Sequence, residues 1–144
     1  IVELLQEDAS ISNVDLAKKI GLAPSSCLIR VKNLKENNVI KSINASVDEK
    51  LLGFEITCFA KVFMSPLNRE TTSVFINEVK KIPEVIECYT ITGDAAFLLK
   101  IVAKNFQYYR DFVFDKLLCV PAVSNIDTSI VVSCEKEANI LPLD

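Results

Sequence analysis

The side chains best suited to chemistry in this sequence are basic and close together, in the segment PSSCLIRVKNLKENNVIKS (residues 24 to 42). Arg30, Lys32, Lys35 and Lys41 occur there with a single acid, Glu36. Grouped ammonium and guanidinium ions bind phosphate oxygens. Between residues 16 and 42, six Lys or Arg and one Glu give a net charge of +5, so the remainder of this −3 chain carries −8. This asymmetry indicates a local nucleic-acid-binding surface on an acidic protein.

Catalytic and metal chemistry have little support in the sequence. The chain contains no histidine, the commonest general base and metal ligand. Asp94 and Asp127 are the candidate carboxylate pair, but nothing in their spacing brings them together. Five cysteines without a C-x-x-C pair indicate free thiols in a reducing cytosol. We therefore expect no enzyme, no metal and no cofactor.

The 144 residues are enough for one ordinary domain or two small ones. No apolar run reaches the roughly 18 residues of a membrane span, so we expect a cytoplasmic protein without a membrane partner. The chain begins at Ile1 rather than Met, and we expect residues to precede it.

Two short helices must position the basic segment. Ser12 begins a capping-box-like S-N-V-D start, followed by Leu16 and Ile20 at helical spacing. Gly21 is placed to end that helix, and Pro24 suits the first turn of the next, which runs to about residue 37. A helix, a glycine turn and a second, basic helix predict a helix-turn-helix.

The second helix is expected to have an apolar and a polar face. The residues spaced to face inward are Leu28, Val31 and Leu34 or Lys35. The exposed face comprises Ser25, Ser26, Ile29, Lys32 and Asn33. Small polar residues allow approach to bases, and cations hold phosphates. An ordinary solvated basic helix is the alternative, against which the preceding helix and the local charge argue.

The second half of the chain alternates strands and helices. Strands are predicted at 55–64, 85–91, 96–103 and 123–133, and helices at 69–81 and 105–118. The order β-α-β-β-α-β predicts a ferredoxin-like domain with an antiparallel sheet. We therefore predict an α+β protein with a helix-turn-helix domain at 1–42, a linker or wing, with a short strand as one possibility, at 43–53 and a βαββαβ domain at 54–144.

Several segments resemble the Lrp/AsnC, or feast/famine, transcriptional regulators. ISNVDLAKKIGLAPSS and PSSCLIRVKNLKENNVI are similar to that family's helix-turn-helix and recognition helix, and PEVIECYTITGDAAFLLKI and TSIVVS continue the similarity in the expected order. The resemblance implies a winged helix-turn-helix followed by a βαββαβ (RAM-type) domain. It also implies double-stranded DNA as partner, a homodimer that assembles further into a tetramer or octamer, and an amino-acid or related metabolite effector.

The resemblance also assigns residues. The implied DNA-binding residues are Ser25, Ser26, Ile29, Arg30, Lys32, Asn33, Lys35 and Lys41. The implied effector-binding residues are Thr92, Gly93, Asp94, Ala95, Ala96, Thr128 and Ser129. Hairpin chemistry alone is an alternative for Gly93 and Asp94, and a polar edge strand is one for Thr128 and Ser129.

Three departures from the family pattern affect these expectations. Ala23 replaces a usual serine cap, at a cost of about 1 kcal/mol to the recognition helix. Ile29 and Asn33 replace residues that are often basic, which predicts weaker phosphate binding and altered base preference. Ala95 and Ala96 replace a Tyr-Asp pair, which predicts different effector selectivity or a site without a ligand. The alternative function is an amino-acid sensor that does not bind DNA, whose N-terminal helices pair with a partner protein.

Overall fold

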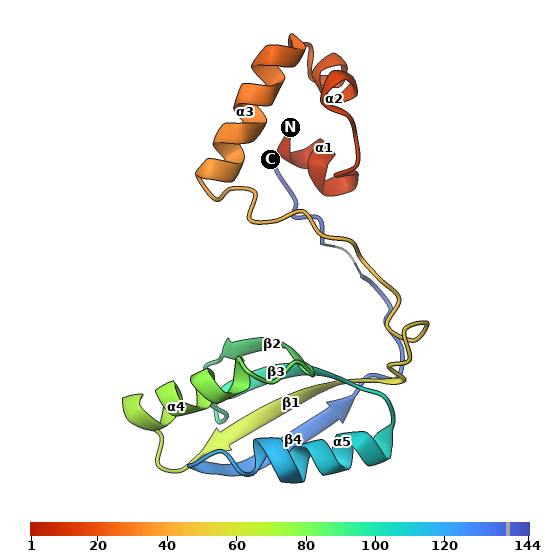
Figure 1. The fold of residues 1–144 in the computed structure, drawn as a ribbon. Helices are drawn as coiled ribbons and strands as arrows, with labels where there is room; N and C mark the ends of the chain where they lie inside the picture. Colours follow the sequence, from red (N-terminus) through yellow and green to blue (C-terminus); the bar gives the residue numbers. More distant parts are fainter. Residues whose placement is uncertain (138) are drawn as a thin grey trace. The chain divides into compact units, whose positions relative to one another are not determined.

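The computed structural model describes residues 1–137 and 139–144, which form two compact units. The first unit comprises Ile1–Ser46 together with Glu135–Asp144, and the second comprises Val47–Cys134 (Figure 1). The C-terminal tail, Glu135–Asp144, therefore groups with the first unit, whereas the domain division predicted from the sequence placed it in the C-terminal domain. Among the described residues, none of the helices combines the length and apolar composition that a membrane-spanning segment requires.

Three helices build the first unit: α1 (Val2–Glu7), α2 (Asn13–Ile20) and α3 (Pro24–Glu36). The Ser12 side chain accepts a hydrogen bond from the Asp15 backbone N–H and caps α2. Gly21 ends α2 with a φ of 69°, in the left-handed region that favours glycine, and Pro24 begins α3. These local signals confirm the predicted helix-turn-helix. Residues 37–55 form turns and irregular backbone rather than the short strand considered for this segment.

The core of the first unit is small and corrects the predicted inward face of α3. Leu28 is 59% exposed, whereas Cys27 is fully buried with Leu16 and Ala17 of α2. Val31 packs against this cluster, four residues after Cys27. Helical spacing i, i+4 therefore starts from Cys27, and the expectation for Leu28 was wrong.

The C-terminal tail is attached to α1 by a paired hydrogen bond. The Gln6 side chain accepts from the Leu141 N–H at 2.7 Å and donates to the Leu141 carbonyl at 3.3 Å. This amide-to-backbone pair imitates one rung of a sheet and explains why residues 135–144 belong to the first unit.

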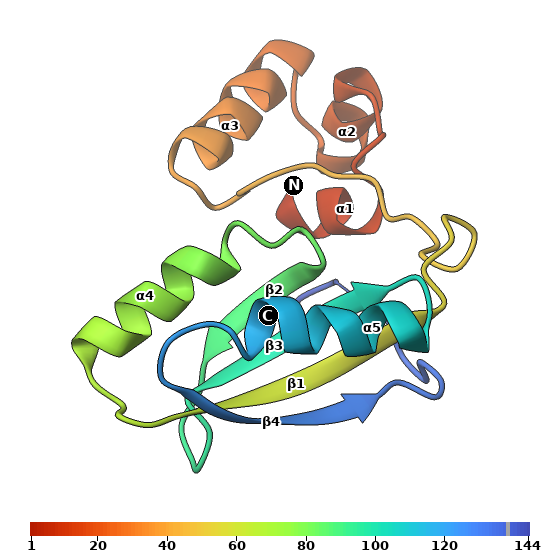
Figure 2. The ribbon, with the colours of Figure 1, turned by 60° about the horizontal axis from the view of Figure 1, so that its bottom comes forward.

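The second unit confirms the predicted βαββαβ order. Its elements are β1 (Ile56–Met64), α4 (Arg69–Val79), β2 (Val85–Thr90), β3 (Phe97–Ala103), α5 (Phe106–Phe112), the π-helical turn η1 (Val113–Leu117) and β4 (Val123–Ile130). The sheet order is β2-β3-β1-β4, with antiparallel pairing throughout. Figure 2 shows α4 and α5 on the same face of this sheet.

Alternation along the central strands builds the core beneath these helices. One face of β1 and β3 contributes Cys58, Ala60, Val62, Phe97, Leu99 and Ile101, all fully buried. Phe75 of α4 stacks on Phe97 with ring centroids 4.5 Å apart. No helix of this described unit packs on the other face of the sheet, which carries the intervening residues of each strand.

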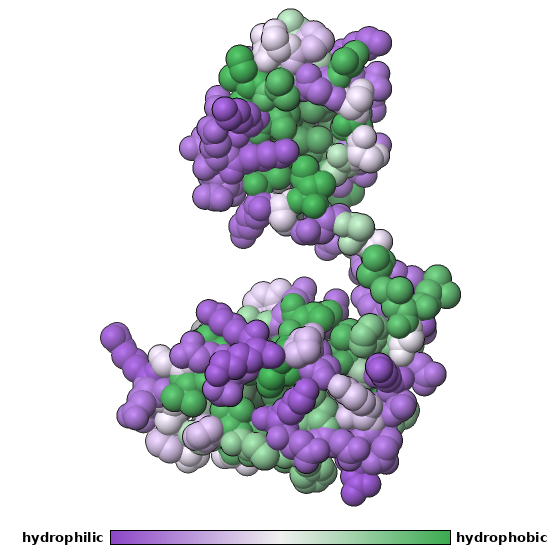
Figure 3. Space-filling view, in the orientation of Figure 1, coloured by the Kyte–Doolittle hydropathy of each residue, from purple (hydrophilic) through white to green (hydrophobic). Residues whose placement is uncertain are grey.

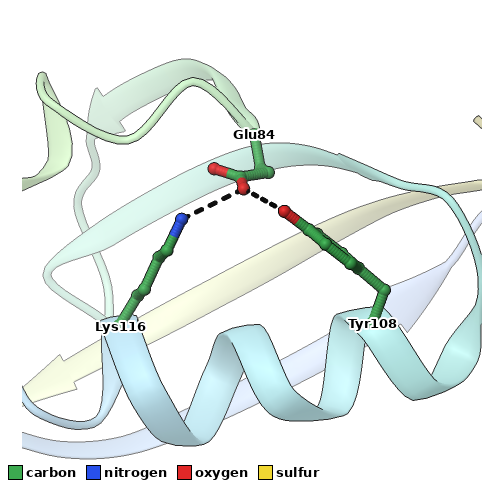
Figure 4. A network of polar contacts seen from close by, with 3 residues as sticks. All are labelled: Glu84, Tyr108 and Lys116. Carbon is green, nitrogen blue, oxygen red and sulfur yellow. Dashed lines mark hydrogen bonds and ion pairs between the residues drawn. The ribbon is translucent and has the colours of Figure 1, made fainter.

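A polar network fastens the start of β2 to the second helix (Figure 4). Glu84 Oε1 accepts hydrogen bonds from the Tyr108 hydroxyl at 2.5 Å and from Lys116 Nζ at 3.1 Å. The Glu84 side chain is only 11% exposed. Burial opposes ionisation of Glu84, but the hydrogen bonds from Tyr108 and Lys116 outweigh it and lower the pKa of the carboxyl.

Replacing Glu84 with Gln should lower the free energy of unfolding at pH 7 by about 1–2 kcal/mol, because a charge-assisted network is lost. The lowered pKa means that this stabilisation is complete above the ordinary value of 4.5 and disappears as the pH falls through the folded value. Urea unfolding followed by circular dichroism at pH 7 and about pH 3 measures it. Glu78→Gln, which breaks the exposed ion pair with Lys81, is the matched control with little expected effect. An equal loss at both pH values for Glu84→Gln would contradict the ionic origin.

Candidate nucleic-acid interface and effector turn

The residues predicted to contact DNA all lie on the surface of the first unit. Those exposed are Ser25, Ser26, Ile29, Arg30, Lys32, Asn33, Lys35 and Lys41. Figure 3 shows hydrophilic side chains gathered over the C-terminal half of α3. Lys41 follows the helix in a segment without regular secondary structure. The helix therefore leaves its polar and basic side chains free to meet a ligand.

Helix geometry divides this surface into a central strip and two flanks. At about 100° per residue, Ser25 and Ile29 lie opposite buried Cys27 and form the central strip, and Lys32 lies between this strip and Lys35. Arg30 lies on one flank, about 60° from Cys27, and Lys35 lies on the other flank, about 80° from Cys27 in the opposite sense. Cations on both sides of an uncharged strip suit a helix in the major groove, where phosphates line both walls.

One acid lies among these cations. Lys32 Nζ is 3.7 Å from Glu36 Oε1, and the two side chains are 73% and 61% exposed. An ion pair so exposed contributes little to stability. Lys32 therefore remains available to a phosphate, and Glu36 reduces the positive charge of the helix's last turn.

The connection between α2 and α3 orients the interface. The Asn13 side-chain amide donates to the Pro24 carbonyl at 2.8 Å and fastens the start of α2 to the start of α3. Ala23 makes no side-chain cap hydrogen bond, as its sequence predicts. Sequence reasoning missed Asn13, because a long-range side-chain bond to backbone leaves no periodic signal.

A groove beside α3 was also missed. It has a volume of about 630 Å³ and contains Arg30 and Asn33 of α3 together with Leu143 and Asp144 of the tail. The tail thus lies beside two of the predicted DNA-binding residues.

The predicted effector turn joins β2 to β3 and divides into an exposed and a buried part. Thr92, Gly93 and Asp94 are exposed. Gly93 has a φ of 109°, a backbone conformation that glycine adopts readily and other residues rarely do. Asp94 Oδ1 accepts from the Ala95 N–H at 2.9 Å. Ala95 and Ala96 are 3% and 7% exposed, so their side chains belong to the core.

The last two predicted effector residues lie elsewhere on the sheet. Thr128 and Ser129 are consecutive on β4 and therefore point to opposite faces. The Thr128 hydroxyl hydrogen-bonds to that of Tyr109 beneath α5. The strand order places β4 two strands from β3, about 10 Å across the sheet. A single chain does not bring Thr128 and Ser129 to the turn at 92–96.

Tyr109, which the sequence did not single out, belongs to a groove along α5 and edge strand β4. Burial raises the pKa of Tyr109 to about 12, so the phenol stays neutral at physiological pH and keeps its bond to Thr128. Arg110 lines the same groove of about 440 Å³. Among the described residues, no group of three or more His, Cys, Asp or Glu is placed to hold a metal ion.

Comparison with known proteins matches both halves of the chain. Residues 1–41 match the model of a winged helix-turn-helix DNA-binding domain, and residues 57–141 match the Lrp/AsnC ligand binding domain. The chain is 54% identical to the transcriptional regulator AzlB of Bacillus subtilis (strain 168), across 100% of this chain and 92% of that protein. It is 31% identical to the leucine-responsive regulatory protein of Escherichia coli (strain K12), across 98% of this chain and 86% of that protein.

A solved structure agrees with these relatives. A transcriptional regulator from Neisseria meningitidis, in complex with L-Met, has a TM-score of 0.93 and 28% identity, covering 99% of this chain and 92% of that one. A helix-turn-helix with an exposed basic helix and a ferredoxin-like α+β domain define a DNA-binding transcriptional regulator. The chain belongs to the Lrp/AsnC family of these regulators.

Replacing Lys32 with Ala should weaken binding to every DNA sequence and reduce the slope of log affinity against log salt by about one ion, because one phosphate contact is lost. Fluorescence anisotropy titrations at several salt concentrations measure both. Lys104→Ala, which removes an exposed lysine from the second unit, is the matched control and should leave both unchanged. Unchanged affinity of the Lys32 variant would remove this residue from the phosphate contacts.

Proposed function

We propose that the protein acts in the cytoplasm as a homodimer that binds an operator on double-stranded DNA. The observation that carries this proposal is the outward face of α3, where the uncharged strip of Ser25 and Ile29 lies between two basic flanks. Ser25, Ser26, Ile29 and Asn33 approach base edges, while Arg30, Lys32 and Lys35 hold phosphates and Lys41 contributes from the segment after the helix. A dimer presents two such helices to half-sites about one DNA turn apart.

The helix-free face of the sheet is the surface we assign to dimerisation. Phe59 of β1 is 38% exposed there, and Tyr89 of β2 is 51% exposed. Lys61 pairs in register with Leu98 on one side and Asp127 on the other. An apolar centre with charges of both signs suits a second copy of the same face. Exposed Phe106 and Phe114 on the helix side leave surface for dimers to join into a tetramer or octamer.

The second part of the proposal is that an amino acid or related metabolite binds at the 92–96 turn, between subunits. The L-Met complex of the Neisseria meningitidis regulator supports this class of ligand. Within one chain, Thr128 and Ser129 lie two strands from the turn, so another copy must supply the second wall of a site that uses both. Ala95 and Ala96 offer only backbone, which leaves Thr92, Gly93 and Asp94 for contact. The effector changes DNA binding only as far as it favours one assembly over another.

Fluorescence anisotropy tests the proposal with a labelled DNA fragment taken from upstream of the gene that encodes this protein. The full-length protein is titrated with excess unrelated DNA, with and without a mixture of amino acids. Competitor-resistant binding that shifts with amino acids is the expected result. If sequences selected from a random pool also show no preferred site, the folded protein is a sensor module instead.

Replacing Phe59 with Asp should convert dimers to monomers, because a charge is buried at the centre of the proposed interface. Light scattering after size-exclusion chromatography measures the mass. Val74→Asp on α4, at 39% exposure against 38% for Phe59, is the matched control and should remain dimeric. A dimeric Phe59 variant would place the interface elsewhere.

Replacing Gly93 with Val should abolish the amino-acid response and spare DNA binding without effector. A branched side chain is strained at a φ of 109° and covers the turn backbone. Anisotropy with and without amino acids measures the response, and circular dichroism confirms the fold. A retained response would move the effector site away from this turn.

A further inference from the structure

Ile29 is an apolar side chain in the middle of a polar surface. It is 60% exposed, and it does not belong to the hydrophobic core of the first unit. Helix geometry places it about 200° from buried Cys27, near the centre of the outward strip. Neither burial nor packing in the described residues accounts for an isoleucine at this position.

The basic flanks fix what Ile29 faces when DNA binds. Arg30 and Lys35 lie on opposite sides of the strip, so contacts from both to phosphates turn the strip toward the floor of the groove. Ser25, one turn earlier on the same face, is small enough to let the helix approach closely. Ile29 is then directed at base edges rather than at the sugar-phosphate wall.

An isoleucine side chain neither donates nor accepts hydrogen bonds. In the major groove, the one apolar group on the base edges is the 5-methyl of thymine. Contact between the two removes both from water, and adenine, guanine and cytosine offer no such methyl group. We propose that Ile29 reads the 5-methyl group of a thymine in each operator half-site, an inference that rests on the proposed operator binding.

Two neighbours on the helix provide matched comparisons. Leu28 has nearly the same exposure, 59%, but lies about 100° from Cys27, on the flank. Asn33 follows Ile29 by one turn, and its amide suits adenine through hydrogen bonds, for which a methyl group is irrelevant. Replacing either residue should change affinity without changing the response to a thymine methyl.

The experiment compares thymine with uracil, which keeps the Watson–Crick pair and lacks only the methyl. An operator is selected from random duplexes with the full-length protein, and deoxyuridine is placed at one thymine position at a time. Anisotropy gives the affinity of the wild type and of the Ile29→Ala, Leu28→Ala and Asn33→Ala variants. Thermal unfolding confirms that each variant is folded.

We expect uracil at one position in a half-site to weaken wild-type binding about fourfold, the factor for one buried methyl group. Ile29→Ala should bind the thymine and uracil operators equally, and Leu28→Ala and Asn33→Ala should keep the fourfold ratio. Specific binding with no uracil-sensitive position, or a ratio kept in Ile29→Ala, overturns this inference and leaves the proposed function standing. Failure to select any sequence overturns both.

Discussion

The rotation of α3 about its own axis is the constraint on which the DNA-binding surface depends, and burial of Cys27 sets it. Cys27 is fully buried against α2, and Leu16 and Ala17 are the other buried members of its cluster among the described residues. One residue of rotation equals about 100°, which would move Ile29 from the strip to a flank and turn Lys32 away from it. Gly21 and the Asn13–Pro24 hydrogen bond hold the crossing of the two helices and thereby preserve that rotation. A small thiol at the contact also lets α3 approach α2 closely, since a larger side chain would hold the helices apart.

In the second unit, the alternation of side chains along each strand decides which residues are buried and which are exposed. Alternation along β1 and β3 sends Phe97, Leu99 and their neighbours under the helices and leaves Phe59 on the opposite face. An antiparallel sheet with helices on one side presents its other side for association. The exposed part of the effector turn and the Thr128–Ser129 pair lie at separate positions on this one domain. Assembly and ligand binding are therefore linked in the proposal, because a site built from both sets exists only where chains meet.

Local signals made much of this structure predictable, and long-range contacts account for what was missed. The Ser12 cap, the Gly21 turn and Pro24 act within a few residues, so they fixed both helices of the helix-turn-helix correctly. The inward face of α3 was misassigned because Leu28 is the more hydrophobic choice, whereas tertiary packing buried Cys27. The tail contact joins Gln6 to Leu141, 135 residues apart, and leaves no periodic trace. Ala95 and Ala96 were assigned to the effector turn by their position in a motif, and the burial of their side chains in the core was not visible in that pattern.

Electrostatics of the first unit restricts how DNA approaches it. Residues 1–15 carry four acids and no base, and residues 135–144 carry three acids and one base. The six basic residues of residues 16–42 are therefore opposed by acidic segments at both ends of the chain within the same unit. A phosphate backbone is attracted to α3 and repelled by α1 and the tail, so the field orients the unit before contact. Few cations contact the phosphates of each half-site, so the sequence-independent part of the DNA affinity is small. Base-edge contacts from the central strip therefore contribute a larger fraction of the affinity for the operator.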